Sequence, residues 1–163
     1  MRRVPYLNRH DMVQEKLFKV AEVEVSYRPD YSMSERPRIS SSMQAFQILK
    51  QQWDDGRIGF LEEFKIILLN RGNSVLGVVD ISMGGLSGTF VDPKIVFSIA
   101  LKANCSSIIL SHNHPSGNVK PSGSDIKLTE RLAECGRLLD IIVWDHLIIS
   151  ENYYYSFLDE GLM

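Results

Sequence analysis

The chain has 163 residues, of which 44% are hydrophobic and 23% are charged, and its formal net charge is −2. This length suits one domain that can bury a hydrophobic core without disulfides. The composition is typical of globular proteins and excludes a disordered tail, a coiled coil and a collagen-like rod. The apolar stretches are only a few residues long, so we expect no membrane span, which needs about 20 apolar residues.

Charge gives no support for a nucleic-acid partner. Residues 1–40 carry 8 Lys and Arg against 6 Asp and Glu, whereas residues 41–163 carry 10 against 14. Neither part has the basic excess that is typical of binding to a phosphate backbone. A nucleic-acid partner therefore stays open, without support from charge.

The cysteines and the N-terminal sequence favour a reducing, cytoplasmic setting. Cys105 and Cys135 lack the number and spacing of a disulfide framework or a metal site, so we expect both to be small core residues. Arg2 and Arg3 are not followed by an apolar run of about 7–15 residues, so this segment does not resemble a signal peptide.

In chain order, the first predicted element is a strand at residues 20–25, where valine and glutamate alternate as on a sheet edge. It belongs to a predicted N-terminal extension, residues 1–40, in which Pro29 and Pro37 interrupt regular structure. We expect residues 41–163 to form the main domain.

Helices and strands are predicted to alternate in this main domain. Helices are expected from Ser41 or Ser42 to Asp54, over 93–102 with Asp92 as its cap, and over 122–138; strands are expected at 64–69, 74–81, 106–111 and 141–149. This order predicts an α/β protein with a mixed β-sheet flanked by helices.

Two of the histidines stand one residue apart at the end of an apolar strand. Residues i and i+2 of a strand point to the same face, so His112 and His114 should project together where the strand becomes a loop. Two convergent imidazoles are the beginning of a zinc site, although such a pair alone is a weak signal.

Asp125 stands eleven residues after His114, in the first turn of the next predicted helix. A loop of this length can return the carboxylate to the histidine pair, which makes three ligands and leaves a fourth position open, as in catalytic zinc sites. Ser122 and Asp125 also form an S-x-x-D capping pattern, so a purely structural role for Asp125 stays open beside the ligand role.

A zinc hydrolase also needs a general base that is not a ligand. Glu62 and Glu63 precede a predicted strand and must face opposite ways. Glu62 shares its face with Phe64 and Ile66, whereas Glu63 shares its face with Lys65 and is expected to be solvated. A carboxylate on the apolar side is costly unless it has a task, so we favour Glu62 as the base.

These residues resemble a known family. The segments Ser111–Gly117 (Ser-His-Asn-His-Pro-Ser-Gly) and Ser122–Asp125 (Ser-Gly-Ser-Asp) are similar to the JAMM (MPN+) metalloprotease signature, and most closely to its bacterial RadC branch. Asp145–Ile149 resembles the Asp-His-Ile-Ile segment of that branch, and Glu62–Phe64 resembles its Glu-His-Phe segment. The resemblance covers roughly residues 41–160.

The resemblance implies a fold and a set of roles. The fold is the three-layer JAMM/MPN (cytidine-deaminase-like) architecture, formed here by a RadC-like domain at 41–163. His112, His114 and Asp125 would bind Zn²⁺, Glu62 would be the catalytic base, and Ser122 would stabilise the oxyanion.

The function that follows is a zinc-dependent hydrolase that cleaves a peptide or isopeptide-like amide bond of a protein or peptide substrate, in a DNA-repair-associated context. Two alternatives stay open: a non-catalytic MPN-type scaffold and a DNA-associated repair module. His146 stands beside Asp145 in the last predicted strand, and we interpret it as a support or structural residue rather than a ligand.

Overall fold

The computed structural model describes residues 32–84 and 89–163, so the strand predicted at 20–25 lies outside the described residues. It is an α/β structure with a five-stranded sheet in the order β2-β1-β3-β4-β5. The α-helices are α1 (Ser42–Gln52), α2 (Pro93–Lys102) and α3 (Gly123–Leu138). The strands are β1 (Glu63–Leu69), β2 (Val75–Met83), β3 (Ser107–Asn113), β4 (Ile142–Ile149) and β5 (Tyr154–Ser156), and a 3₁₀ turn (Met33–Glu35) precedes α1.

The sheet is mixed, as the sequence predicts. β1 pairs antiparallel with both β2 and β3, β3 and β4 run parallel, and β4 pairs antiparallel with β5. β5 was not expected, because three residues are too few to show an alternating pattern. The central strands β1 and β3 are buried along their whole length.

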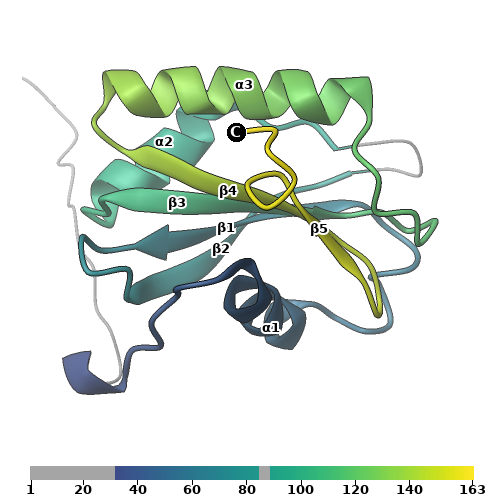
Figure 1. Cartoon of the computed structure of the whole chain (residues 1–163), viewed down its shortest axis with the longest axis horizontal. Helices are drawn as coiled ribbons and strands as arrows, with labels where there is room; N and C mark the ends of the chain where they lie inside the picture. Colours follow the sequence, from purple (N-terminus) through teal and green to yellow (C-terminus); the bar gives the residue numbers. More distant parts are fainter. Residues whose placement is uncertain (1–31, 85–88) are drawn as a thin grey trace, which may run out of the picture.

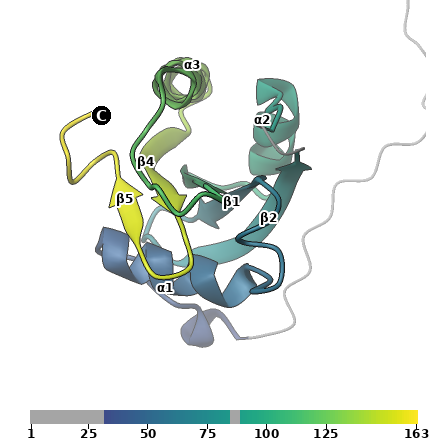
Figure 2. The same ribbon diagram turned by 90° about the vertical axis from the view of Figure 1, so that its right-hand side faces the viewer.

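Helices cover both faces of this sheet and make three layers. Figures 1 and 2 show α2 and α3 together on one face and α1 on the other. Each face has its own apolar core: Phe64 and Leu110 belong to the core under α2 and α3, whereas Ile67 and Ile109 belong to the core over α1. The alternation of side chains along β1 and β3 supplies both cores.

The sheet face under α1 contradicts the position predicted for Glu63. Glu63 was predicted to be solvated, but its exposed fraction is 3%, equal to that of Lys65 on the same face. The prediction was wrong because it treated the polar side of β1 as solvent-facing, whereas α1 and Trp53 cover that side. Glu63 is instead paired with Lys65, with 3.1 Å between Oε2 and Nζ.

The predicted cap of α2 and the predicted core positions of the two cysteines agree with the structure. Asp92 caps α2 by accepting a hydrogen bond from the Lys94 N–H, as expected. Cys105 is a buried core residue, and the half-buried Cys135 packs against the same core. Among the described residues, no helix has the length and apolar character that crossing a membrane requires.

Candidate metal centre

The end of β3 brings two imidazoles together. His112 and His114 point to the same side of the sheet, and their Nε2 atoms are 3.0 Å apart. His112 is almost fully buried, whereas His114 is partly exposed at the strand end. The i and i+2 relation in a strand explains this convergence, so the predicted pairing of the two rings is confirmed.

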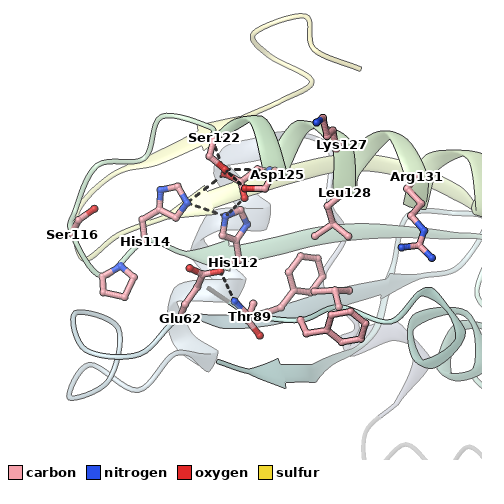
Figure 3. A pocket seen from close by; sticks show the side chains of 15 residues that line it. Glu62, Thr89, His112, His114, Ser116, Ser122, Asp125, Lys127, Leu128 and Arg131 are labelled. Atoms are coloured by element: carbon pink, nitrogen blue, oxygen red, sulfur yellow. Dashed lines mark hydrogen bonds and ion pairs between the residues drawn. The ribbon is translucent and has the colours of Figure 1, made fainter. Parts of the chain in front are cut away.

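Asp125 joins them from the first turn of α3. Its Oδ1 lies 3.4 Å from His112 Nε2, and its Oδ2 lies 3.6 Å from His114 Nε2. One donor atom from each of the three residues falls within 4.8 Å of the others, so the group could hold a metal ion. Figure 3 shows the three side chains turned toward one another.

The capping interpretation of Asp125 holds at the same time. Its Oδ2 accepts hydrogen bonds from the Ser122 N–H at 2.7 Å and the Ser122 hydroxyl at 2.6 Å, and the Ser122 hydroxyl oxygen accepts one from the Asp125 N–H. The result is a capping box at the start of α3. The cap fixes one carboxylate oxygen and orients the other toward His112.

The pKa values of Asp125 and His114 reflect the contact between the carboxylate and the two rings. Partial burial raises the pKa of Asp125, but hydrogen bonds with His112, His114 and Ser122 outweigh it and hold that pKa well below its usual range. The same carboxylate raises the pKa of His114 above its usual value. An anionic oxygen beside two ring nitrogens is a favourable environment for a cation.

The donor set fits zinc, which binds histidine nitrogen and carboxylate oxygen. The Nδ1 atom of His114 lies 2.6 Å from the Asn118 carbonyl oxygen, which can only accept, so Nδ1 carries a proton and Nε2 of the neutral ring has a free lone pair. That Nε2 atom lies 3.0 Å from Nε2 of His112, and its lone pair is available to a cation.

Glu62 lies beside these residues because of the antiparallel register. Phe64 pairs with His112, and the same register continued by two residues brings Glu62 opposite His114. Figure 3 shows the Glu62 carboxylate pointing toward the histidines. Its Oε1 accepts a hydrogen bond from the Thr89 N–H at 3.2 Å, and within the described residues its other oxygen has no hydrogen-bond partner.

Glu62, Ser122, His112, His114 and Asp125 all line one open cavity of about 960 Å³. The cavity extends from the histidines along α3 and has a partly apolar wall, formed by Phe64, Phe90, Val91 and Leu128. The five residues chosen from the sequence are therefore brought together, although they come from segments up to 63 residues apart.

The sequence places Asn113 on the strand face opposite the two histidines and suggests a role in the following turn, whereas its hydrogen bonds go to the segment before β1. It stands between the two histidines on the opposite face of β3 and is fully buried. Its side-chain NH₂ donates to the Ile58 and Leu61 carbonyls, and its Oδ1 accepts from the Glu63 N–H. It thereby holds the segment that carries Glu62, a contact over about 50 residues that no local pattern indicates.

His146 lies directly behind the site. Its Nε2 is 2.8 Å from His112 Nδ1, and its Nδ1 is 2.6 Å from the Thr129 hydroxyl oxygen. Burial holds the pKa of His146 well below its usual range. The structure thus places His146 against a candidate ligand and outside the cluster itself, and it adds Thr129, which the sequence analysis missed.

The chain is similar in sequence to known proteins over most of its length. The sequence profile of the "RadC-like JAB domain" matches residues 39–162. A "UPF0758 protein" of Flavobacterium johnsoniae is 42% identical over 127 residues, which is 77% of this chain and 53% of the relative. One from Alkaliphilus metalliredigens is 49% identical over 102 residues, or 63% of this chain and 44% of the relative.

A third such protein, from Rubrobacter xylanophilus, is 42% identical over 130 residues, covering 78% of this chain and 55% of the relative. The chain thus spans about half the length of the curated relatives it matches. The profile covers most of the chain, including β1, β3 and α3, which carry the site. The chain belongs to the RadC-like JAB domain family.

Proposed function

We propose that this domain is a zinc-dependent hydrolase of the JAMM type that cleaves an amide bond in a peptide or isopeptide-like linkage. The observation that carries the proposal is the convergence of two Nε2 atoms and a carboxylate at one end of an open cavity, with Glu62 across from them. When bound by His112, His114 and Asp125, zinc would lower the pKa of a coordinated water to about 7 and polarise the scissile carbonyl.

Glu62 is the proposed general base. One of its oxygens is held by the Thr89 N–H, which orients the carboxylate toward the histidines and leaves the second oxygen to take a proton from the attacking water. After attack, the same carboxyl group can deliver the proton to the leaving amine. Its partly buried position at the cavity wall limits competition from bulk water.

Ser122 is proposed as the oxyanion donor. Its hydroxyl proton points to Asp125 Oδ2 in this structure, so donation to a substrate requires the hydroxyl to rotate toward the cavity that it lines. The backbone hydrogen bond from Ser122 to Asp125 can hold the carboxylate during this rotation. A single well-placed donor of this kind lowers the activation barrier by about 3 kcal/mol.

The cavity wall favours an amide substrate over a nucleic acid. The charged side chains of its lining balance, with Lys127 and Arg131 against Glu62 and Asp125, so apart from a bound ion the cavity offers no basic excess for a phosphate backbone. Phe90, whose exposed fraction is 81%, and Leu128 instead offer apolar surface for substrate side chains. A peptide or protein chain fits this lining, and any DNA-associated role would need contacts beyond this cavity.

Metal analysis of the purified protein tests the proposal. The wild-type protein should carry about one zinc per chain, and a His112→Ala, His114→Ala double variant should carry none. A His10→Ala variant serves as the control, because nothing assigns that residue to the site. Equal zinc content in the wild-type protein and the double variant would refute the metal site.

A screen with fluorogenic peptides and isopeptide-linked peptides tests the hydrolysis itself. Zinc-loaded wild-type protein should cleave at least one class of amide, and Glu62→Gln should retain zinc but lose cleavage. Cleavage that survives in the Glu62→Gln variant would reject Glu62 as the base. No cleavage by a fully zinc-loaded protein would favour the non-catalytic scaffold.

A further inference from the structure

A buried series of hydrogen bonds connects His112 to helix α3. His112 Nδ1 lies 2.8 Å from His146 Nε2, and His146 Nδ1 lies 2.6 Å from the Thr129 hydroxyl oxygen. The Thr129 hydroxyl in turn lies 2.6 Å from the backbone carbonyl of Asp125, one helical turn earlier. His146 has no exposed surface, and Thr129 has an exposed fraction of 3%, so solvent does not interrupt the series.

The direction of every bond follows from the last one. A carbonyl can only accept, so the single hydroxyl proton of Thr129 points to the Asp125 carbonyl oxygen. The Thr129 oxygen must then accept from the Nδ1–H of His146. A neutral imidazole has one N–H, so His146 Nε2 is an acceptor and His112 Nδ1 must be the donor.

The surroundings of His146 favour its neutral form. Its ring stacks on Phe157 at a centroid distance of 4.9 Å and meets the edge of Phe64 at 5.7 Å. The carboxylate of the neighbouring Asp145 accepts hydrogen bonds from Ser156 and from two backbone N–H groups, not from the His146 ring. An imidazolium in this aromatic pocket would be costly.

We propose that Thr129 and His146 are positioning residues that fix His112 in the tautomer with its proton on Nδ1 and its Nε2 lone pair directed at the metal site. Imidazole ligands are commonly oriented by a hydrogen bond at the other ring nitrogen, and here that bond passes through a second histidine to a threonine. The proposal rests on the proposed function for the ion that the lone pair binds. It does not depend on hydrolysis.

Asp125 takes part in two ways. Its carboxylate faces the two histidines, while its backbone carbonyl ends the series that orients His112. The first turn of α3 therefore sets both the position of one ligand and the protonation pattern of another. His114 differs, because its Nδ1–H bonds directly to the Asn118 carbonyl, and this makes it an internal control.

The matched variants are Thr129→Val and Thr129→Ser. Valine keeps the volume but removes the acceptor for His146, whereas serine restores the hydroxyl. Nitrogen NMR of the imidazole rings, recorded on the metal-free protein at mildly alkaline pH, reports which ring nitrogen carries each proton. In the wild-type protein and in Thr129→Ser, His112 and His146 should both be protonated on Nδ1.

In Thr129→Val, the protons of His146 and His112 should move to Nε2, while His114 keeps its tautomer. A Zn²⁺ competition titration with a chromophoric chelator should show affinity weaker by about 10- to 100-fold for Thr129→Val and near the wild-type value for Thr129→Ser. Wild-type tautomers and affinity in Thr129→Val would overturn the proposal.

The wild-type spectrum decides the question even if Thr129→Val does not fold, because a proton on Nε2 of His112 in the metal-free wild-type protein contradicts the series directly. The two proposals also fail separately. If the wild-type protein binds no Zn²⁺, the proposed function is refuted while the NMR result still tests the tautomer. If it binds Zn²⁺ with His112 protonated on Nδ1 but cleaves nothing, only the hydrolase is lost.

Discussion

Two polar clusters with buried ionisable members lie on opposite faces of the central strands, and they differ in how their charges are satisfied. The lysine cluster consists of Glu63, Lys65 and Asp80: Lys65 Nζ lies 3.1 Å from Glu63 Oε2, also pairs with Asp80, and sits 4.7 Å above the Trp53 ring. The lysine cluster thus contains its own cation.

The histidine cluster, formed by His112, His114 and Asp125, brings a carboxylate and two imidazole nitrogens together and includes no lysine or arginine. It also opens into a cavity of about 960 Å³, whereas the cavity beside the lysine cluster is about 240 Å³. The comparison shows that burial and charge alone do not identify a binding site. The histidine cluster is the candidate because it opens into a cavity and its carboxylate has no lysine or arginine partner within the cluster.

The largest expected effect concerns Glu62, which adjoins the histidine cluster without belonging to it. Glu62→Gln should lower the rate of amide cleavage by about 100- to 10,000-fold, the usual contribution of a general base, with the zinc content unchanged. The cleavage rate is measured with a substrate from the peptide screen, and the zinc content is measured by metal analysis of the same sample. Loss of zinc in Glu62→Gln would show that Glu62 is a metal ligand and belongs to the histidine cluster.

The next effect breaks the lysine cluster. Lys65→Met leaves the buried Glu63 with only the half-exposed Arg57, whose Nε lies 3.5 Å from Glu63 Oε1, so the free energy of unfolding should fall by about 3 kcal/mol, the lower end of the cost of breaking a buried ion pair. Lys50→Met is the matched control, because Lys50 pairs with an exposed Asp55 and its loss should cost at most about 1 kcal/mol. Urea unfolding measures both variants, and equal losses would show that the lysine cluster is not special.

The histidine cluster should give the metal-free protein a distinct pH dependence. Asp125 raises the pKa of His114, so this group contributes stability that is fully present below about pH 6.5 and is lost as the pH rises through the raised pKa. Urea unfolding of chelator-treated protein, repeated at a series of pH values from about 6.5 upward, measures this loss of stability. His114→Gln should flatten the curve, and an unchanged slope in that variant would contradict the assignment.

The smallest effect concerns the exposed member of the lysine cluster. Most of the Asp80 side chain is accessible to solvent, so Asp80→Asn should change the free energy of unfolding by no more than about 1 kcal/mol. The reason is that Glu63 still neutralises Lys65 after this change. A loss as large as that of Lys65→Met would show that Asp80, not Glu63, is the essential partner.

The parts of this site that could be predicted are those with local signals. The spacing of His112 and His114 on a strand, and the cap pattern at Ser122 and Asp125, depend on neighbours in the chain, and both are confirmed by the geometry. The solvated position expected for Glu63 was wrong, because the sequence predicts the preceding helix but does not show on which face of the sheet that helix packs.

Thr129 and Asn113 were beyond prediction for a related reason. Thr129 bonds to a carbonyl four residues earlier, which is common for threonine in any helix, and its contact with His146 arises only when α3 packs on β4. The bonds that Asn113 makes to the segment before β1 likewise arise only from the antiparallel pairing of β1 with β3.

The hydrogen bonds of Asn113 restrict the movement of the segment before β1. A single side chain at the tip of β3 binds the segment that carries the proposed base, while the residues on either side of it face the opposite surface and are two of the candidate ligands. Moving the backbone of the segment before β1 away from β3 would break three hydrogen bonds of one amide group, two of them fully buried. The backbone positions of the proposed base and of the candidate ligands are therefore tied together by the pairing of β1 with β3 and by this amide.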